Sequence, residues 1–164
     1  KETELENRIT KPVIPETLVN TVEVEETKSP QFIQNDSITH LWESELESLT
    51  KTFGDFKIKT ELRENNHNVR QIDTIKTLTF DKSKIVVYST GGFYAIWGAD
   101  IKNEELPVWN YVKVGMKKYQ FEKTLAIPLK SDTLKLGNLE QTSLFEFHFS
   151  QGELYRVKFE GYVD

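Results

Sequence analysis

The first long pattern of apolar positions along the chain is helical. Trp42, Leu46, Leu49 and Phe53 are spaced i, i+4, i+7 and i+11, so they fall on one face of a helix. Gly54 follows the last of them, at the place where a left-handed residue commonly ends a helix. The spacing therefore predicts an amphipathic helix that buries this face and stops at Gly54.

The pattern then changes to a period of two. Apolar and polar residues alternate in short runs separated by polar turns, as is typical of antiparallel strands. These runs cover residues 56–62, 72–80, 85–90, 93–97, 145–149 and 154–163. In the last run Tyr155, Val157 and Phe159 share one face. A shorter helical pattern lies at 117–126 and ends before Pro128. We therefore expect an α+β fold, in which an antiparallel β-sheet carries short helices packed on one face.

The chain divides near residue 36. Residues 1–36 contain no glycine, hold three of the five prolines, and mix acidic with small apolar residues. This composition predicts an acidic, proline-containing tether, mostly extended or disordered, although the alternation at 17–26 leaves a docked edge strand open. We interpret residues 37–164 as one α+β domain. Helix, loop and hairpin follow one another twice, so two tandem helix-hairpin units, 37–101 and 109–164, are a further hypothesis.

The second of these units begins with the sequence VKVGMKKYQFEKTLAIP, residues 112–128. Gly115 can take a positive φ where strand turns into helix, and Met116 can fill the space beneath that helix. The stretch resembles a motif of the β-lactamase-inhibitor-protein-like fold, found also in small outer-membrane lipoproteins of the β-barrel assembly machinery. The matching positions are Val112, Gly115, Met116, Phe121, Leu125 and Pro128, whereas Ala126 stands where that family prefers glycine. The resemblance implies that the sheet face carries the function.

Composition narrows the choice of partner and compartment. The net charge is −5, of which −4 lies in residues 1–38, so the remainder is nearly neutral and nucleic acid is a poor partner. There is no cysteine, which excludes a disulfide framework and a thiol nucleophile in this sequence. The chain starts at Lys1, and an acidic tether before a globule suits a processed lipoprotein or secreted protein. We expect a periplasmic or outer-membrane-anchored protein of the cell envelope, with peripheral attachment through a lipidated residue before Lys1 as one form.

Aromatic residues cluster between positions 93 and 111. If Val112 and Val114 face the core, the period of two places Trp109, Tyr111 and Lys113 on the outer face. An exposed Trp–Tyr pair is a candidate anchor for another envelope protein or a glycan. The first hypothesis is thus a non-catalytic binding or scaffolding protein that presents a sheet face to a protein partner. The alternative interpretation is that these rings fill the core.

A second hypothesis is a small-ligand or glycan-binding carrier with an aromatic-lined pocket between sheet and helices. Trp97 and Tyr94 would stack on the ligand in such a pocket.

Catalytic motifs are scarce. The sequence has no zinc-protease helix, nucleophile elbow or phosphate loop, and it suggests no cofactor and no metal. His148 and Glu146 alternate with phenylalanines on the polar side of a strand, and a hydrolase that uses this pair is the third hypothesis. We expect a non-enzymatic protein.

Overall fold

The structure is a computed structural model that describes residues 29–106 and 112–162. Most of the expected tether, residues 1–28, lies outside these ranges. The elements of the described part are β1 (Gln31–Gln34), α1 (Asp36–Thr52), β2 (Lys57–Glu64), β3 (Ile72–Phe80), β4 (Ser83–Thr90), β5 (Phe93–Ile101), α2 (Lys118–Leu125), β6 (Thr133–Gly137), β7 (Ser143–Ser150) and β8 (Glu153–Gly161). The fold is α+β, as the sequence predicted.

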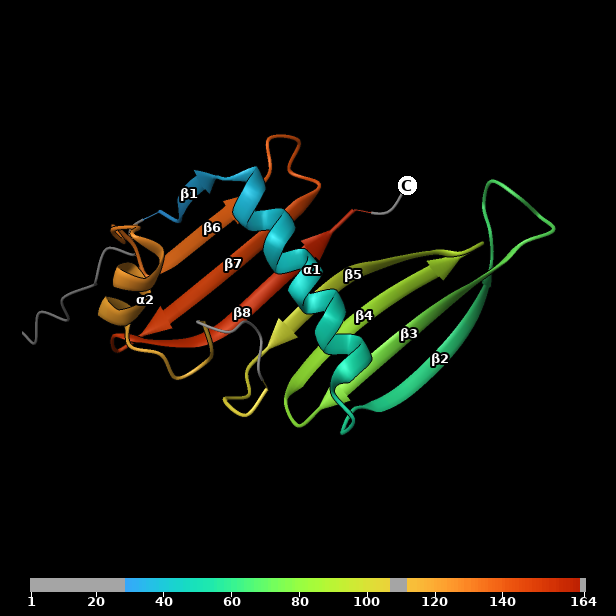
Figure 1. Cartoon of the computed structure of the whole chain (residues 1–164), viewed down its shortest axis with the longest axis horizontal. Helices are drawn as coiled ribbons and strands as arrows, with labels where there is room; N and C mark the ends of the chain where they lie inside the picture. The colour runs from blue at the N-terminus through green and yellow to red at the C-terminus, as the bar shows by residue number, and fades with distance from the viewer. Residues whose placement is uncertain (1–28, 107–111, 163–164) are drawn as a thin grey trace, which may run out of the picture.

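All eight strands belong to one sheet, in the order β1-β6-β7-β8-β5-β4-β3-β2 (Figure 1). Every pairing is antiparallel except that of β1 with β6, which is parallel. The expected purely antiparallel sheet is therefore wrong at this edge. The sequence pattern placed β1 in the tether, and it predicted no strand at the position of β6. The domain boundary accordingly moves ahead of residue 31.

Helix α1 ends differently from the sequence prediction, although its buried face is the predicted one. The side chain of Asn35 accepts a hydrogen bond from the Ile38 N–H and caps the first turn. Trp42, Leu46 and Leu49 are all buried. The helix ends at Phe53 in an extended conformation, and Gly54 does not have a positive φ. The predicted left-handed ending is therefore wrong, and the extended Phe53 packs against the margin of the core.

Helix α2 is short, with a positive-φ residue at or near each end and one large buried side chain. Gly115 has a φ of +87°, as predicted for the turn into the helix. Ala126 ends the helix in the left-handed conformation at φ 53°, the geometry that usually selects glycine. Phe121, fully buried, is the residue that fixes the helix to the core. Ala126 therefore holds a backbone conformation that glycine adopts more easily.

The core lies on the face of the sheet that carries Phe145, Phe147 and Phe149 of β7, here called the Phe face. Trp42 of α1 meets the rings of Phe145 and Phe147 edge-on, with centroids 5.6 and 5.3 Å away. Phe121 of α2 contacts Phe147 and Phe149 at 5.0 and 5.1 Å. Figure 1 shows α1 crossing the sheet diagonally. The side chains that alternate with these phenylalanines form the other face, here called the polar face.

Candidate functional site

A row of alternating charges crosses the polar face. Each residue of the row lies directly opposite the next one on the neighbouring strand, and the strands follow the order β6, β7, β8, β5, β4. The row consists of Lys135, Glu146, Lys158, Asp100 and Lys84. Opposite charges that lie directly across from each other stabilise an antiparallel pair by about 0.2–1 kcal/mol. The row therefore adds cross-strand attraction over five neighbouring strands of the sheet.

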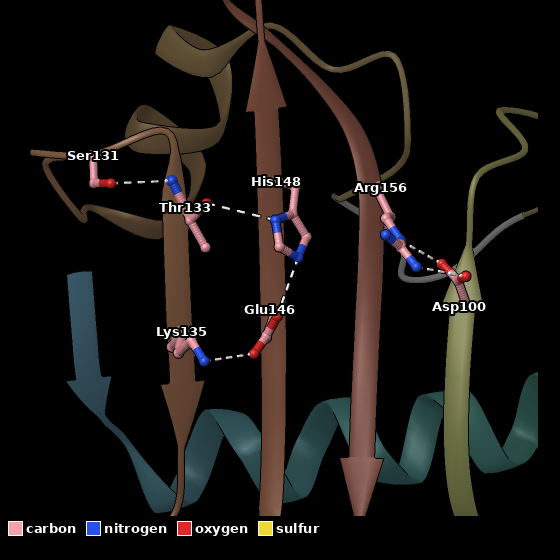
Figure 2. A network of polar contacts seen from close by, with 7 residues as sticks. All are labelled: Asp100, Ser131, Thr133, Lys135, Glu146, His148 and Arg156. Carbon is pink, nitrogen blue, oxygen red and sulfur yellow. Dashed lines mark hydrogen bonds and ion pairs between the residues drawn. The ribbon is translucent and has the colours of Figure 1, made fainter. Parts of the chain in front are cut away.

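Two ion pairs involve residues of this row (Figure 2). Arg156 of β8 donates from Nε and Nη2 to the two carboxylate oxygens of Asp100, at 2.7 and 2.9 Å. Lys135 Nζ lies 2.7 Å from Glu146 Oε1. Burial alone would raise the pKa of Asp100, but the hydrogen bonds from Arg156 and Lys102 hold it below its ordinary value. A two-point guanidinium–carboxylate contact also fixes orientation, so this part of the face is preorganised.

His148 lies between the two pairs and contacts Glu146 and Thr133 (Figure 2). Its Nε2 is 3.1 Å from Glu146 Oε2, and its Nδ1 is 3.5 Å from Thr133 Oγ1. Burial, together with the nearby Arg156 and Lys158, lowers the pKa of His148 although Glu146 acts to raise it. Burial would raise the pKa of Glu146, but Lys135 and the other nearby cations keep it below its ordinary value. Hydroxyl, imidazole and carboxylate follow the order of a nucleophilic triad, yet the 3.5 Å contact exceeds the roughly 2.6–3.2 Å of an activated nucleophile.

Acid should destabilise the protein first through His148. Its folded pKa lies below the ordinary 6.5, so the unfolded chain takes up this proton first as the pH falls. The free energy of unfolding should thus start to fall below about pH 6.5, and Glu146 and Asp100 should add to the loss below their ordinary values of 4.5 and 3.8. Urea unfolding between pH 7.5 and 3.5 measures this profile.

The matched comparison uses two histidine variants. His148→Gln should remove the part of the profile that begins near pH 6.5, while His67→Gln, in an exposed loop, should leave it unchanged. An equal effect of both variants would contradict the assignment to His148.

Within residues 29–106 and 112–162 the sheet has two β-bulges, and each one involves an aromatic residue. In β5 the register shifts between Gly98 and Ile96, so Trp97 is the extra residue. In β8 the register passes from Arg156 to Leu154, so Tyr155 is extra. Trp97 meets the ring of Tyr88 at 6.1 Å and Tyr155 meets that of His148 at 6.2 Å, and both ring partners belong to the polar face.

Both bulged aromatic side chains remain open to solvent. Trp97 is 39% and Tyr155 is 49% exposed. Bulges commonly re-aim a side chain at functional positions. Here the second bulge removes Tyr155 from the alternation that would place it with Val157 and Phe159, and Leu154 takes the buried position instead. The sequence expectation for Tyr155 is therefore wrong.

A small hollow opens beside Trp97. Its volume is about 120 Å³, and its walls include Arg63, Asn65, His67, Asp73, Tyr88 and Trp97. Asp73 is only 3% exposed, and it accepts hydrogen bonds from the Tyr88 hydroxyl at 2.6 Å and from Asn65 Nδ2 at 3.0 and 3.1 Å. Burial would raise the pKa of Asp73, but hydrogen bonds from Thr90, Tyr88 and Asn65 keep it lowered. The hollow thus has an aromatic wall and a firmly held carboxylate.

The side chain of Asn65 also builds the loop that borders this hollow. Its Oδ1 accepts hydrogen bonds from the backbone N–H groups of His67 and Asn68, at 2.9 and 2.8 Å. Asparagine favours such turns because its side chain can replace a backbone acceptor. One residue therefore both shapes the β2–β3 connection and positions Asp73.

The residues predicted as a site are not all brought together. Trp97 lies on the polar face, but Tyr94 lies on the Phe face, where its hydroxyl bonds Thr50 of α1 and Lys51 covers its ring at 4.7 Å. Trp97 and Tyr94 therefore do not line one pocket between sheet and helices. Lys113 is exposed between buried Val112 and Val114, but residues 112–114 belong to none of the strands of the described sheet, so its place on a sheet face stays a prediction.

Two of the predicted anchors cannot be compared with the structure. Trp109 and Tyr111 lie outside the described residues. Their assignment to the outer face stays a prediction from the sequence.

Several polar-face residues escaped the sequence analysis. Arg156 and Asp100 sit in strands far apart along the chain, and only the β5–β8 pairing makes them neighbours. Asp73 and Tyr88 occupy alternating runs that indicate strands but not contacts. A buried acidic residue inside an apolar run was the one available signal, since such a carboxylate needs donors nearby.

Comparisons with known proteins add no family to this description. No protein-family model matches the chain, and neither does a curated protein or a solved structure. Among the described residues, no helix is both long and apolar enough to cross a membrane. The same residues contain no cluster of three or more His, Cys, Asp or Glu side chains that could hold a metal ion.

Proposed function

We propose that this protein is a non-catalytic binding domain that presents the polar face of its sheet to a protein partner. The observation that carries the proposal is the pair of β-bulges, which put Trp97 and Tyr155 on this face half-exposed. Exposed Trp, Tyr and Arg side chains are the residues that dominate protein–protein hot spots. Arg156 and Asp100 lie between the two rings along the central strand pair.

The distribution of helices supports this choice of face. Trp42 and Phe121 both contact Phe147, so we infer that α1 and α2 cover the Phe face and leave the polar face to a partner. We also infer two tandem units, because α1 precedes β2–β5 and α2 precedes β6–β8. The first unit would then hold four strands instead of one hairpin. A sheet face backed by short helices agrees with the resemblance at residues 112–128, and an envelope location remains part of the proposal.

The dimensions of the face suit an extended contact. Trp97 is close in register to Gly161 at one end of β8, and Tyr155 is near the other end. At about 3.3 Å per residue the two rings are roughly 20 Å apart. A partner that reached both would cover the Arg156–Asp100 pair and exclude water from it, which strengthens the electrostatic part of recognition.

Photo-crosslinking in the native host tests this proposal directly. A benzoylphenylalanine at position 97 or 155 should capture the same discrete protein partner. Trp97→Ala should then weaken binding of that partner by about tenfold or more without changing the unfolding midpoint, because the ring is a contact and not part of the core.

The matched control is Tyr119 of α2, an aromatic residue that is 66% exposed outside the sheet. A crosslinker at 119 should give no such adduct. Identical adducts from 97 and 119, or none from 97 and 155, would contradict the proposed face.

The hollow beside Trp97 favours a second candidate function, the binding of a glycan. A stacking ring next to a held carboxylate and an asparagine is the kind of surface that sugars recognise. Titration with a glycan panel should quench tryptophan fluorescence, and Trp97→Phe should remove most of that response. A panel that gives no response would eliminate this candidate and leave protein binding unaffected.

A further inference from the structure

Strand β2 forms one edge of the sheet and is exposed along its whole length. It is last in the strand order, and all eight of its residues are exposed. Ile58 and Leu62 are 61% and 72% exposed, which is unusual for the apolar side of a strand. In the described ranges, 29–106 and 112–162, no strand pairs with its outer edge.

The outer edge has hydrogen-bonding groups to offer. The Asn65 N–H donates to the Gln71 carbonyl across the hairpin, so alternation directs the backbone groups of odd-numbered β2 residues toward β3. The groups of Ile58, Thr60 and Leu62 then point away from the sheet. Such a row is a template for another strand.

We propose that β2 pairs with β2 of a second copy of this chain, antiparallel and centred on Thr60. A two-fold axis perpendicular to the sheet would pass between the two Thr60 residues and join the two sheets into one. Residues directly opposite each other in an antiparallel pair share a face. Ile58 therefore meets Leu62 of the second copy on the Phe face, and Lys59 meets Glu61 of the second copy on the polar face. By symmetry each contact forms twice.

The apolar side chains and the charges together favour this register over its neighbours, because centring the pair on Thr60 places Ile58 opposite Leu62 and Lys59 opposite Glu61. Centring the pair on Lys59 would pair Lys57 with Glu61, but it would place two lysines directly opposite each other and Ile58 opposite Thr60. Centring it on Glu61 would place two glutamates opposite each other and Lys59 opposite Arg63. Like charges in directly opposed positions destabilise a strand pair. The Thr60 register brings like charges together only at its outer ends, where Lys57 lies opposite Arg63 once on each side of the axis. A strand that is complementary to itself in one register favours a second copy over an unrelated partner.

Within a single copy, Lys59 and Glu61 of β2 already form the kind of ion pair that the dimer would form between copies. Lys59 Nζ and Glu61 Oε1 of one copy lie 2.6 Å apart, and the hydrogen bond with Lys59 lowers the pKa of Glu61. Both side chains are exposed, so exchanging this pair for the corresponding pair across the interface requires no unfolding. The dimer adds the backbone hydrogen bonds and the burial of Ile58 and Leu62.

Charge-reversal variants of the full chain test the proposal. Sedimentation should show the wild-type chain as a dimer in the micromolar range, with strand-like circular dichroism unchanged in all variants. Lys59→Glu and Glu61→Lys should each raise the dissociation constant of the dimer by about tenfold or more, because each creates like-charge contacts on both sides of the axis. The double variant K59E/E61K restores opposite charges, and it should dimerise like the wild type.

Mixing the two single variants gives the sharpest result. A copy with Glu at 59 and 61 and a copy with Lys at 59 and 61 should form a heterodimer, although each alone is monomeric. Loss of folding cannot produce this rescue. A monomeric wild-type chain, dimers that ignore both charge reversals, or a mixture that stays monomeric would each overturn the proposal. A photo-crosslink from position 58 to a different protein would assign the edge to that protein instead.

Discussion

Replacing Phe147 with alanine should lower the free energy of unfolding by about 3–5 kcal/mol. Phe147 is completely buried, and its ring contacts Trp42 of α1, Phe121 of α2 and Phe145 of the same strand. Removing it leaves a cavity at the point where both helices meet the sheet. For a chain of this length the melting temperature should fall by about 6–20 °C. Thermal and urea unfolding monitored by near-ultraviolet circular dichroism provide the measurement.

Tyr155→Ala is the matched control, since it removes a ring from the neighbouring strand without opening the core. Tyr155 is 49% exposed at its bulge, so the free energy of unfolding should change by less than about 1 kcal/mol. If Tyr155→Ala were as damaging as Phe147→Ala, Tyr155 would be a core residue and unsuitable as a partner contact. If Phe147→Ala were nearly neutral, the helices would not depend on the Phe face.

The sequence predicts those elements whose apolar pattern is strong and local. The i, i+4, i+7 spacing of Trp42, Leu46 and Leu49 specifies the buried side of α1, and the three phenylalanines of FEFHF specify the core side of β7. In both cases one face of the element is buried, and the spacing of apolar residues alone identifies that face. The positive φ of Gly115 is equally local, because few other residues tolerate it.

The elements that sequence analysis missed depend on partners far along the chain. Strand β6 has only Leu134 and Leu136 as apolar residues, both fully buried between β1 and β7, and its surroundings are polar. Strand β2 gives the opposite case, since its alternation predicts a buried side that the strand order leaves at the edge. Neither outcome can be obtained from a local pattern, because burial in a sheet depends on which strands lie on each side.

The candidate site was predicted only in part for a related reason. Trp97 was identified from the density of aromatic residues, but a bulge decides which face it occupies, and a bulge changes the period within a single strand. The same effect reverses the expectation for Tyr155. The polar face becomes visible only when β5 and β8 are paired, because this pairing brings Asp100 to Arg156.

Gly161→Ala should also lower the free energy of unfolding substantially, and it tests the pairing of β5 with β8. A Cβ at Gly161 would collide with the carbonyl oxygen of Ile96 on β5 and approach a ring carbon of Phe159 to 3.0 Å. The Ile96 carbonyl is part of the backbone and cannot rotate away as a side chain could, so β5 and β8 would have to move apart. In the described sheet this β5–β8 pairing joins strands β2–β5 to strands β6–β8. Overpacking of this kind costs about 1–3 kcal/mol and occasionally more, and hydrogen exchange should quicken at the β5–β8 amides before those of β3–β4.

Gly98→Ala is the control, because its Cβ would lie 3.4 Å from the Phe159 carbonyl, an ordinary contact. Equal effects of the two substitutions would mean that the close approach at Gly161 does not determine how the two halves of the sheet are joined.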